Sequence, residues 1–310
     1  MANIYTVIVT YNGLKNNWIK KCIDSLENSE IPLPIIVVDN NSADGTVRFI
    51  KENYPGVILL ESAENLGFGK ANNIGIKKAI ENNADYFFLL NQDAYIQPDT
   101  VKILYNAMEK EPEYGIVSPM HMNGSGTKLD FNFSNYIGPR HCKELCSDFV
   151  TNTIQNRIYE SQFINAAAWL ISRKCIETVG GLSPVFYHYG EDVNYIHRLQ
   201  YKNFRIGVQP AAFIFHDREN RVDNKKYDLA YYTKKNALRI ATQFSDPNNK
   251  ESETVFLASK VLKLIISTLK FNKLKHKILR FEIGYYLKNR KAFRHYLDAS
   301  KSGRKFTFIQ

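Results

Sequence analysis

The chain has 310 residues, and the 44% that are hydrophobic suffice for a sizeable core in one large domain or in one domain with an appendage. Its basic excess is local, because residues 255–310 carry 14 basic and 2 acidic side chains whereas residues 1–254 carry 27 and 29. A nucleic-acid enzyme needs its basic stripe around the catalytic cleft, so this terminal excess argues against a nucleic-acid partner.

The cysteines and the apolar runs indicate a cytoplasmic protein. The cysteines are too few and too irregularly spaced for a disulfide framework in a chain of this length. No stretch reaches the roughly 18 uninterrupted apolar residues that a membrane span needs. The N-terminus enters a strand-like run without a basic leader, which is not the pattern of a signal peptide. The four cysteines are Cys22, Cys142, Cys146 and Cys175.

The first 120 residues alternate short β-branched runs with longer segments of helical period, a pattern typical of a parallel sheet covered by helices. The runs IIVVD and YFFLLN are apolar almost throughout, as expected of strands buried on both faces. The expected strands are Ile4 to Thr10, Ile35 to Val38, Val57 to Glu61, Tyr86 to Leu90 and Gly115 to Ser118. Helices are expected near 18–28, 45–53, 69–82 and 98–110.

The remainder predicts a long polar excursion and then more regular structure. The periodicity fades between residues 120 and 162, which favours a long loop. Further on, the expected elements are regular structure over 163–172, a helix near 191–202, short strands around 205–215, a helix over 228–243, and two or more basic amphipathic helices within 252–300. We therefore expect an α/β domain over 1–225 and a basic helical region over 226–310.

Polar residues follow three of the predicted strands, where ligands bind in open α/β sheets. These are Thr10-Tyr11-Asn12, Asp39-Asn40-Asn41 and Asn91-Gln92-Asp93. A carboxylate at position 39 can accept hydrogen bonds from a base or ribose, although turn and cap roles are open alternatives. One aspartate at a strand end, such as Asp93, can hold Mg²⁺ or Mn²⁺ against a diphosphate leaving group.

A second acidic cluster lies in the sequence Tyr187-His188-Tyr189-Gly190-Glu191-Asp192. Two adjacent acids at a helix start suit a general base with a tuned pKa, and the alternative is a favourable interaction with the helix dipole. His216 ends a strand-like run and is a candidate third metal contact, although a lone histidine is more often structural.

Taken in order, these segments resemble glycosyltransferase family 2, inverting enzymes of GT-A fold, and in particular its bacterial rhamnosyltransferase-like branch. The resemblance covers roughly residues 4 to 216. It rests on the motifs VIVTYN, VDNNSADGT, NLGFGKANNIGI, LLNQDAYIQPD, GGLSPVFYHYGEDVNYIHRLQ and PAAFIFH.

The resemblance implies a role for each matching residue. Glu191 and Asp192 match the pair that supplies the catalytic base, and Asp93 with His216 matches the metal contacts for Mn²⁺ or Mg²⁺. Trp169 and Tyr189 fall where the acceptor or sugar is bound, with core packing as the alternative for Trp169. The implied contacts to the donor nucleotide sugar are Thr10, Asn12, Asp39, Asp44, Asn65, Gly67, Lys70, Asn73, Asn91, Gln92 and Asp93. For Asp44, helix capping is an equally good reading.

The function expected is transfer of a sugar, rhamnose or another hexose, from a nucleoside diphosphate sugar to a saccharide or lipid-linked acceptor of bacterial surface polysaccharide. Two departures limit the transfer of detail: Asn91 replaces the first acid of the metal motif, and Leu182-Ser183-Pro184 replaces a Phe-Asp-Glu. The alternatives are a sugar-nucleotide-binding protein without transfer activity and a nucleotidyltransferase. The latter needs a basic Gly-rich loop near the first strand, where VIVTYNGLKNN has one glycine.

The basic C-terminal region interleaves lysine and arginine with aromatic and aliphatic residues. This pattern suits helices that lie on anionic lipid at the inner face of the plasma membrane, close to a lipid-linked acceptor. The alternatives are a basic helical cap and a contact between copies in a homo-oligomer.

Overall fold

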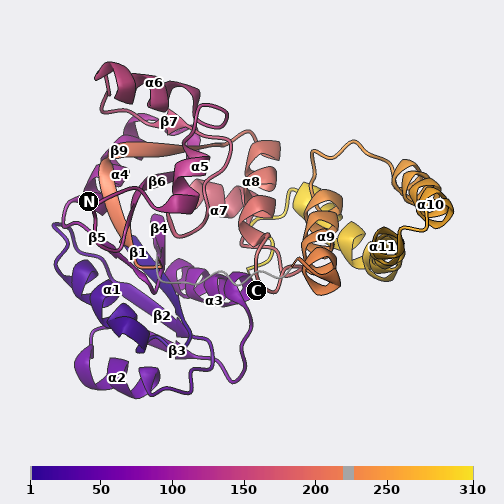
Figure 1. Ribbon diagram of the computed structural model, residues 1–310. Helices are drawn as coiled ribbons and strands as arrows, with labels where there is room; N and C mark the ends of the chain where they lie inside the picture. Colours follow the sequence, from indigo (N-terminus) through magenta and orange to yellow (C-terminus); the bar gives the residue numbers. More distant parts are fainter. Residues whose placement is uncertain (1, 219–226, 310) are drawn as a thin grey trace.

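A computed structural model describes residues 2–218 and 227–309. It is a mixed α/β structure with one curled sheet, and a bundle of C-terminal helices stands beside it (Figure 1). The strand order is β3-β2-β1-β4-β8-β6-β9-β5, with β7 paired to β9. The expected α/β fold class is confirmed.

The strands and helices expected up to residue 110 form with bounds within two residues of those predicted. All five residues of β2 are buried, which explains why its sequence is apolar up to the final aspartate. The strands are β1 (Ile4–Thr10), β2 (Ile35–Asp39), β3 (Ile58–Glu61) and β4 (Tyr86–Asn91). A short 3-10 turn (Lys15–Asn17) precedes α1 (Trp18–Glu27), and the other helices are α2 (Thr46–Asn53), α3 (Phe68–Glu81) and α4 (Thr100–Lys110).

The second half of the sheet is mixed and not parallel throughout. Strand β8 is antiparallel to both of its neighbours, β4 and β6, whereas β6 and β9 are parallel. The carboxyl ends of β1, β2, β4, β6 and β9 therefore meet at one edge of the sheet. The remaining strands are β5 (Ala94–Ile96), β6 (Tyr114–Asn123), β7 (Tyr159–Glu160), β8 (Ala168–Ser172) and β9 (Arg205–His216).

The prediction of a long loop over 120–162 was wrong for much of that segment. Strand β6 continues to Asn123, and two short helices follow, α5 (Phe131–Tyr136) and α6 (Lys143–Thr151). Asp130 caps α5 by accepting a hydrogen bond from the Phe133 N–H at 2.9 Å. Helices this short complete too few turns to produce a clear apolar period. Strand β9 is likewise one continuous strand where short strands were expected.

The helices from residue 191 onwards agree with the prediction, whereas α7 was not expected. None of the helices within 2–218 and 227–309 is both long and apolar enough to cross a bilayer. The expected domain boundary at 225/226 lies outside the described residues. The helices are α7 (Arg173–Val179), α8 (Glu191–Tyr201), α9 (Leu229–Phe244), α10 (Glu253–Leu269) and α11 (Lys273–Lys301).

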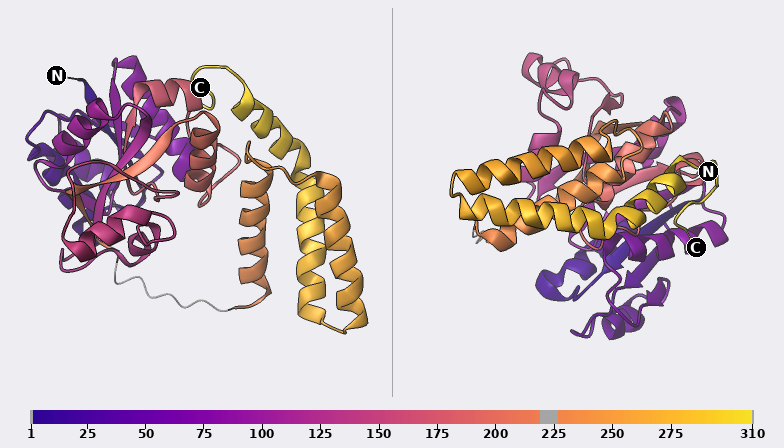
Figure 2. Two further views of the ribbon diagram at one scale, coloured as in Figure 1. Left: turned by 90° about the horizontal axis from the view of Figure 1, so that it is seen from above. Right: turned by 90° about the vertical axis from the view of Figure 1, so that its right-hand side faces the viewer.

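The C-terminal helices have a small core of their own, built from Ile240, Phe256, Tyr286 and Phe293, and it extends to Phe186 of the main domain. After α11 the chain returns to the main domain, as both views of Figure 2 show. There the Gly181 N–H donates to the Thr307 carbonyl at 2.7 Å.

Glycine is required where the tail docks. Gly180 has a φ of +87°, and a Cβ there would lie 2.0 Å from the Thr307 carbonyl oxygen. Residues 306–309 are therefore packed into the main domain, and we call this segment the C-terminal latch.

A buried carboxylate joins the three C-terminal helices. Glu282 is 4% exposed and accepts from Arg239 of α9 at 2.8 Å and from Lys260 of α10 at 2.7 Å. The Lys260 side chain is itself only 12% exposed, so its ammonium depends on this partner.

Glu282→Gln is therefore expected to lower the free energy of unfolding by about 3 kcal/mol, because it leaves a largely buried ammonium without a countercharge. Urea denaturation of the full chain measures the change. Glu52→Gln is the matched control, since Glu52 pairs with Arg48 on the surface of α2, and it should cost less than about 1 kcal/mol. Equal effects of the two substitutions would contradict a stabilising role for the Glu282 contacts.

Candidate active site

The first candidate side chain at the shared carboxyl edge of the sheet is that of Asp39. In the sheet register Thr10 lies beside Asp39 and Val9 beside Asn91, so the ends of β2, β1 and β4 are adjacent. Asp39 is 2% exposed, and its Oδ2 accepts from the Ser42 N–H at 2.9 Å. Its buried Oδ1 makes no hydrogen bond to any residue that the structure describes. That oxygen is an acceptor available to a base or a ribose hydroxyl.

Asn12 and Asp44 join the loops after β1 and β2. Asn12 is in the left-handed region with a φ of 50°, and its Oδ1 accepts from the Ala43 N–H at 2.9 Å. Its own N–H donates to the Ser42 hydroxyl at 2.9 Å. Asp44 Oδ2 accepts from the Leu14 N–H at 3.1 Å. Both residues thus shape the loop beside Asp39, and a direct contact to the nucleotide stays a prediction.

Thr10 and Gln92 join the ends of β1 and β4. The Thr10 hydroxyl donates to Gln92 Oε1 at 2.6 Å, and the Tyr11 N–H donates to the same oxygen at 3.0 Å. Gln92 Nε2 donates back to the Tyr11 carbonyl at 3.1 Å. These bonds hold the two loops in register, so both side chains act here as supports of the edge.

The loop before α3 packs against the segment that leads to the acidic pair. Gly67 has a φ of +78°, and a Cβ there would lie 1.9 Å from the Tyr187 carbonyl oxygen. Asn65 Oδ1 accepts from the Gly67 N–H at 3.0 Å and fixes this turn. The side chain of Lys70, in the first turn of α3, is exposed to solvent. The glycine is needed for close approach of two backbones.

Asn73 has a different role from the one expected. Its Nδ2 donates to the Leu182 carbonyl at 2.8 Å and to the Phe308 carbonyl at 3.0 Å, and its Oδ1 accepts from the Leu182 N–H at 2.8 Å. Because these backbone bonds occupy both ends of the amide, the prediction that Asn73 contacts the donor is corrected. Asn73 clamps the loop after α7 to the C-terminal latch.

Asp93 and His216 form a buried pair at the end of β4 and β9. Asp93 Oδ1 lies 3.3 Å from His216 Nε2, and the Asp217 N–H donates to the Asp93 carbonyl at 2.8 Å. The other ring nitrogen, Nδ1, lies 3.8 Å from Asp130 Oδ2. Asp130 is itself bonded by Arg218, whose Nε donates at 2.6 Å. His216 Nδ1 is buried without a hydrogen bond to a described residue, so Asp130 faces the imidazole as a nearby charge and does not hold it by a hydrogen bond.

This pair is not a complete protein cage for a metal. Among residues 2–218 and 227–309, no group of three or more His, Cys, Asp or Glu side chains is arranged to hold an ion. Mg²⁺ and Mn²⁺ in nucleotide enzymes take one or two protein carboxylates and complete their shell with phosphate oxygens and water. The Asp93–His216 pair fits that kind of shared site.

Glu191 and Asp192 begin α8 after Gly190, whose φ is 91°. Glu191 is 5% exposed, and burial together with the charge of Asp192 raises its pKa to about 7. Burial also raises the pKa of Asp192, while hydrogen bonds from backbone N–H groups, including those of Val193 and Ala166, oppose the increase. A carboxyl with a raised pKa is a stronger base in its ionised form, which suits general base catalysis.

The two acidic centres lie on the same side of the molecule. The Asn91 N–H donates to the Ala167 carbonyl at 2.9 Å, and the Ala166 backbone lies close enough to Asp192 to lower the pKa of its carboxyl. The short segment before β8 therefore lies next to both the metal motif and the acidic pair. That Asp39, Asp93, Asp192 and His216 line one pocket able to hold a diphosphate stays a prediction.

Three residues that the sequence did not single out complete the site. Burial raises the pKa of Tyr136, the charge of Asp192 raises it further, and Arg218 opposes this effect. Tyr136 thus lies between Asp192 on one side and the Asp130–Arg218 pair on the other. The sequence could have indicated Asp130 only as the cap of a helix, and the short helices of this segment give no apolar period by which to predict them.

The two predicted acceptor-site aromatics differ. Trp169 is fully buried in β8 and packs against the ring of Tyr195, with ring centroids 5.7 Å apart. The prediction that Trp169 lines a sugar pocket is therefore corrected, because this side chain is packed in the core. Tyr189 is 56% exposed with a φ of 70°, and only Gly190 separates it from the acidic pair. An exposed ring at that position remains a candidate platform for a sugar.

Relatives in sequence are sugar transferases. The model of the family described as glycosyl transferase family 2 matches residues 5–180. The N-acetylglucosaminyl-diphospho-decaprenol L-rhamnosyltransferase of Mycobacterium tuberculosis is 24% identical over 212 residues, which cover 61% of this chain and 68% of that protein.

Solved structures share the fold. TarS of S. aureus, residues 1–349 in complex with UDP-GlcNAc, superposes with a TM-score of 0.54 at 16% identity, covering 96% of this chain and 83% of that one. This chain spans 54% of a longer TarS structure. A mannosyltransferase of Pyrobaculum calidifontis, in complex with GDP-Man and Mn²⁺, gives 0.52 at 18% identity, covering 96% and 74%.

The family model covers more than half of the chain, and its span contains the strand ends that carry Asp39 and Asp93. The acidic pair at the start of α8 lies beyond that span but at the same edge of the sheet. The chain belongs to glycosyl transferase family 2 and is a nucleotide-sugar-dependent glycosyltransferase.

Proposed function

We propose that this enzyme transfers a hexose, with rhamnose as the first candidate, from a nucleoside diphosphate sugar to a saccharide or lipid-linked acceptor, with inversion at the anomeric carbon. The observation that carries the proposal is the position of Ala166 and Ala167, since the Ala167 carbonyl accepts from the Asn91 N–H and the Ala166 backbone lies close enough to Asp192 to lower the pKa of its carboxyl. The name of the mycobacterial relative, a rhamnosyltransferase with a lipid-linked acceptor, supports the choice of sugar and acceptor.

The donor nucleotide would lie along the edge formed by β1, β2 and β4. Asp39 offers its Oδ1 to a base or ribose, and the loops held by Asn12 and Asp44 enclose it. The diphosphate would then reach Asp93 and His216. Mn²⁺ or Mg²⁺ held by these two side chains would neutralise the charge that develops on the leaving diphosphate. The Mn²⁺ in the mannosyltransferase neighbour supports this assignment.

Asp192 is the base in this proposal. It accepts the proton of the acceptor hydroxyl while that oxygen forms a bond to the anomeric carbon and the bond to the diphosphate breaks. The nucleophile approaches from the face opposite the leaving group, so the configuration inverts. Glu191 lies beside this base, and burial together with the charge of Asp192 raises the pKa of Glu191 to about 7.

Asp192→Asn is expected to lower kcat by about 1,000-fold, because an amide cannot accept the proton. Donor affinity should change less than about threefold, since the side chain faces the acceptor in this scheme. Transfer is measured with a panel of nucleotide sugars and acceptors in Mn²⁺, and the anomeric configuration of the product by NMR. Loss of donor binding in a folded Asp192→Asn variant, or a product of retained configuration, would contradict the proposal.

The acidic pair also predicts the pH dependence of kcat/KM. The pKa of Glu191 is raised to about 7 and that of Asp192 is raised above the usual aspartate value, so the pair begins to gain protons as the pH falls below about 7 and the base is progressively lost. We expect kcat/KM to be level above that pH and to fall below it. In Glu191→Gln, removal of the neighbouring negative charge should shift the fall to lower pH. An unchanged profile in that variant would argue against coupling between the two carboxyls.

Asp93→Asn tests the proposed diphosphate site. In the presence of Mn²⁺ it should weaken binding of a nucleoside diphosphate by about tenfold or more, because the Asp93–His216 pair loses its charge. Thermal stabilisation of the protein by UDP, GDP and dTDP, with and without Mn²⁺, measures the effect and identifies the base. Asp85→Asn, a change at the exposed amino end of β4, is the control and should leave binding unaltered. Equal stabilisation of both variants would refute this site.

A further inference from the structure

The C-terminal hairpin presents an apolar face that no described part of the chain covers. Six large aliphatic residues on α10 are at least 40% exposed. Five of them, spaced by 7, 3, 1 and 3 residues, share one face of the helix, and Val261 borders that face. We name this face the apolar stripe, and it consists of Val255, Leu262, Ile265, Ile266 and Leu269.

The apolar stripe faces away from the other C-terminal helices. The opposite face of α10 is already packed, since Phe256 and Ser267 are buried against the other C-terminal helices. The stripe continues onto the turn between α10 and α11, where Phe271 is 89% exposed. Exposed large apolar residues that form a continuous row mark an interaction site more strongly than scattered ones do.

Basic side chains border this apolar surface. Lys263 and Lys270 are exposed on α10, and α11 opens with Lys273, Lys277 and Arg280. The last three are spaced by four and three residues, so they share one face of α11. No acidic residue occurs between Glu253 and Glu282.

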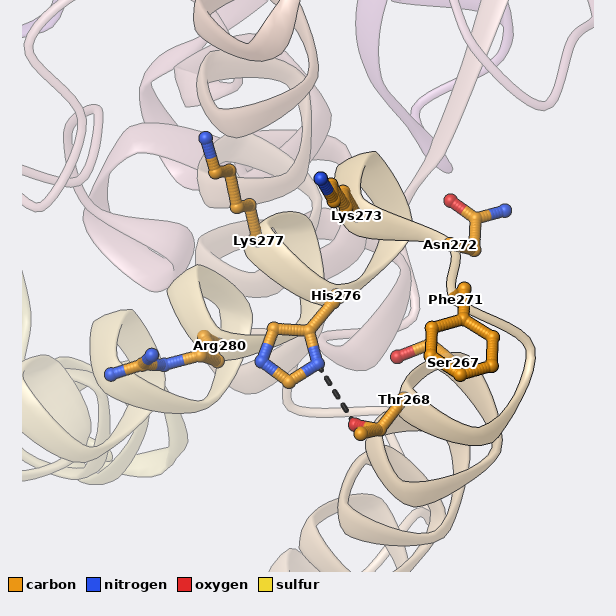
Figure 3. Close-up of a pocket in the computed structure, with 8 residues that line it drawn as sticks. All are labelled: Ser267, Thr268, Phe271, Asn272, Lys273, His276, Lys277 and Arg280. Carbon is orange, nitrogen blue, oxygen red and sulfur yellow. Dashed lines mark hydrogen bonds between the residues drawn. The ribbon is translucent and has the colours of Figure 1, made fainter.

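A groove lies at the tip of the hairpin (Figure 3). It has a volume of about 460 Å³ and is lined by Phe271, Lys273, Lys277 and Arg280 among others. The ring of His276 on its wall is fixed by a contact to the Thr268 hydroxyl at 3.1 Å. Lysine and arginine donors around a small hollow beside an exposed aromatic ring suit a phosphate group whose attached chains are apolar.

The direction of the hairpin is also informative. In both views of Figure 2 the tip projects away from the C-terminal latch, on the side of the main domain where α5 and α6 lie. Helix α5 adjoins the active site, because its cap Asp130 lies 3.8 Å from His216. A surface that receives the tip would therefore lie on the side of the molecule where α5 adjoins the candidate active site.

We propose that the hairpin of α10 and α11 docks on an anionic phospholipid bilayer, with the apolar stripe and Phe271 in the interface and Lys273, Lys277 and Arg280 on the lipid phosphates. Charge selects this occupant over a second copy of the chain. Residues 255–310 carry 14 basic and 2 acidic side chains, so two stripes packed together would bring like charges into contact. A bilayer with anionic headgroups satisfies both the apolar and the basic part of the surface.

The test is co-sedimentation of the full chain with vesicles, without any sugar donor, so that the outcome does not depend on the proposed transfer reaction. Vesicles of phosphatidylcholine mixed with phosphatidylglycerol should bind the protein, and vesicles of phosphatidylcholine alone should bind it at least tenfold less. Each basic side chain at an anionic surface contributes about fivefold, so Lys273→Glu/Lys277→Glu/Arg280→Glu should weaken binding by about 100-fold or more. Added salt should weaken binding of the wild-type chain.

Matched controls keep the result specific. The control Lys77→Glu/Lys110→Glu/Lys174→Glu makes the same change of net charge at exposed positions of the main domain. Its affinity for the mixed vesicles should lie within threefold of that of the wild-type chain. Leu262→Ser/Ile266→Ser/Leu269→Ser should abolish stable binding, whereas Phe149→Ser/Val150→Ser/Ile154→Ser on and beside α6 should not. Circular dichroism confirms folding of each variant.

Two outcomes would overturn the proposal. One is equal loss of vesicle binding in the hairpin and control variants. The other is a wild-type dimer by light scattering in the absence of lipid, abolished by the three serine substitutions in α10, together with no binding to anionic vesicles. That second result would assign the apolar stripe to contact between copies.

Discussion

The active-site edge depends on one backbone contact, the hydrogen bond from Asn91 to Ala167 that joins the end of β4 to the segment before β8. Because β8 is antiparallel to β4, the residues that precede it lie at the carboxyl end of β4. The same short segment lies beside Asp192, since the Ala166 backbone lowers the pKa of that carboxyl. A reversal of one strand therefore brings the turn that carries Asp93 and the start of α8 to the same place, which a wholly parallel sheet with longer crossovers would not do in so few residues.

Much of this arrangement follows from local sequence. Strands buried on both faces must be apolar throughout, so IIVVD and YFFLLN are distinct from the helices around them, and a polar residue at the end of such a run marks the sheet edge. Asp39, Asp93 and His216 could be identified on that basis. The mixed direction of the sheet could not, because an antiparallel strand of five residues such as AWLIS has the same composition as a parallel one.

The errors have a common physical origin, since a motif specifies residue types and not their partners. Asn73 lies within a donor-loop motif, yet its amide is used by Leu182 and by the C-terminal latch. Trp169 is a suitable sugar platform by type, but its place on a central strand buries it. Asp130 and Tyr136 were missed for the opposite reason. They lie on α5, which is too short to produce a period, and their importance arises from contacts across the fold.

The C-terminal region is connected to the catalytic centre by more than the order of the chain. The latch residues Thr307 and Phe308 bond to Gly181 and Asn73, and Asn73 in turn bonds to Leu182. The loop that begins there continues to Gly190 and the acidic pair. Docking of the hairpin on a surface would thus act on a segment whose far end is anchored beside the base. A link of this kind suits an enzyme whose acceptor is presented at a surface, because the element that senses the surface and the loop that carries the base share one set of backbone contacts.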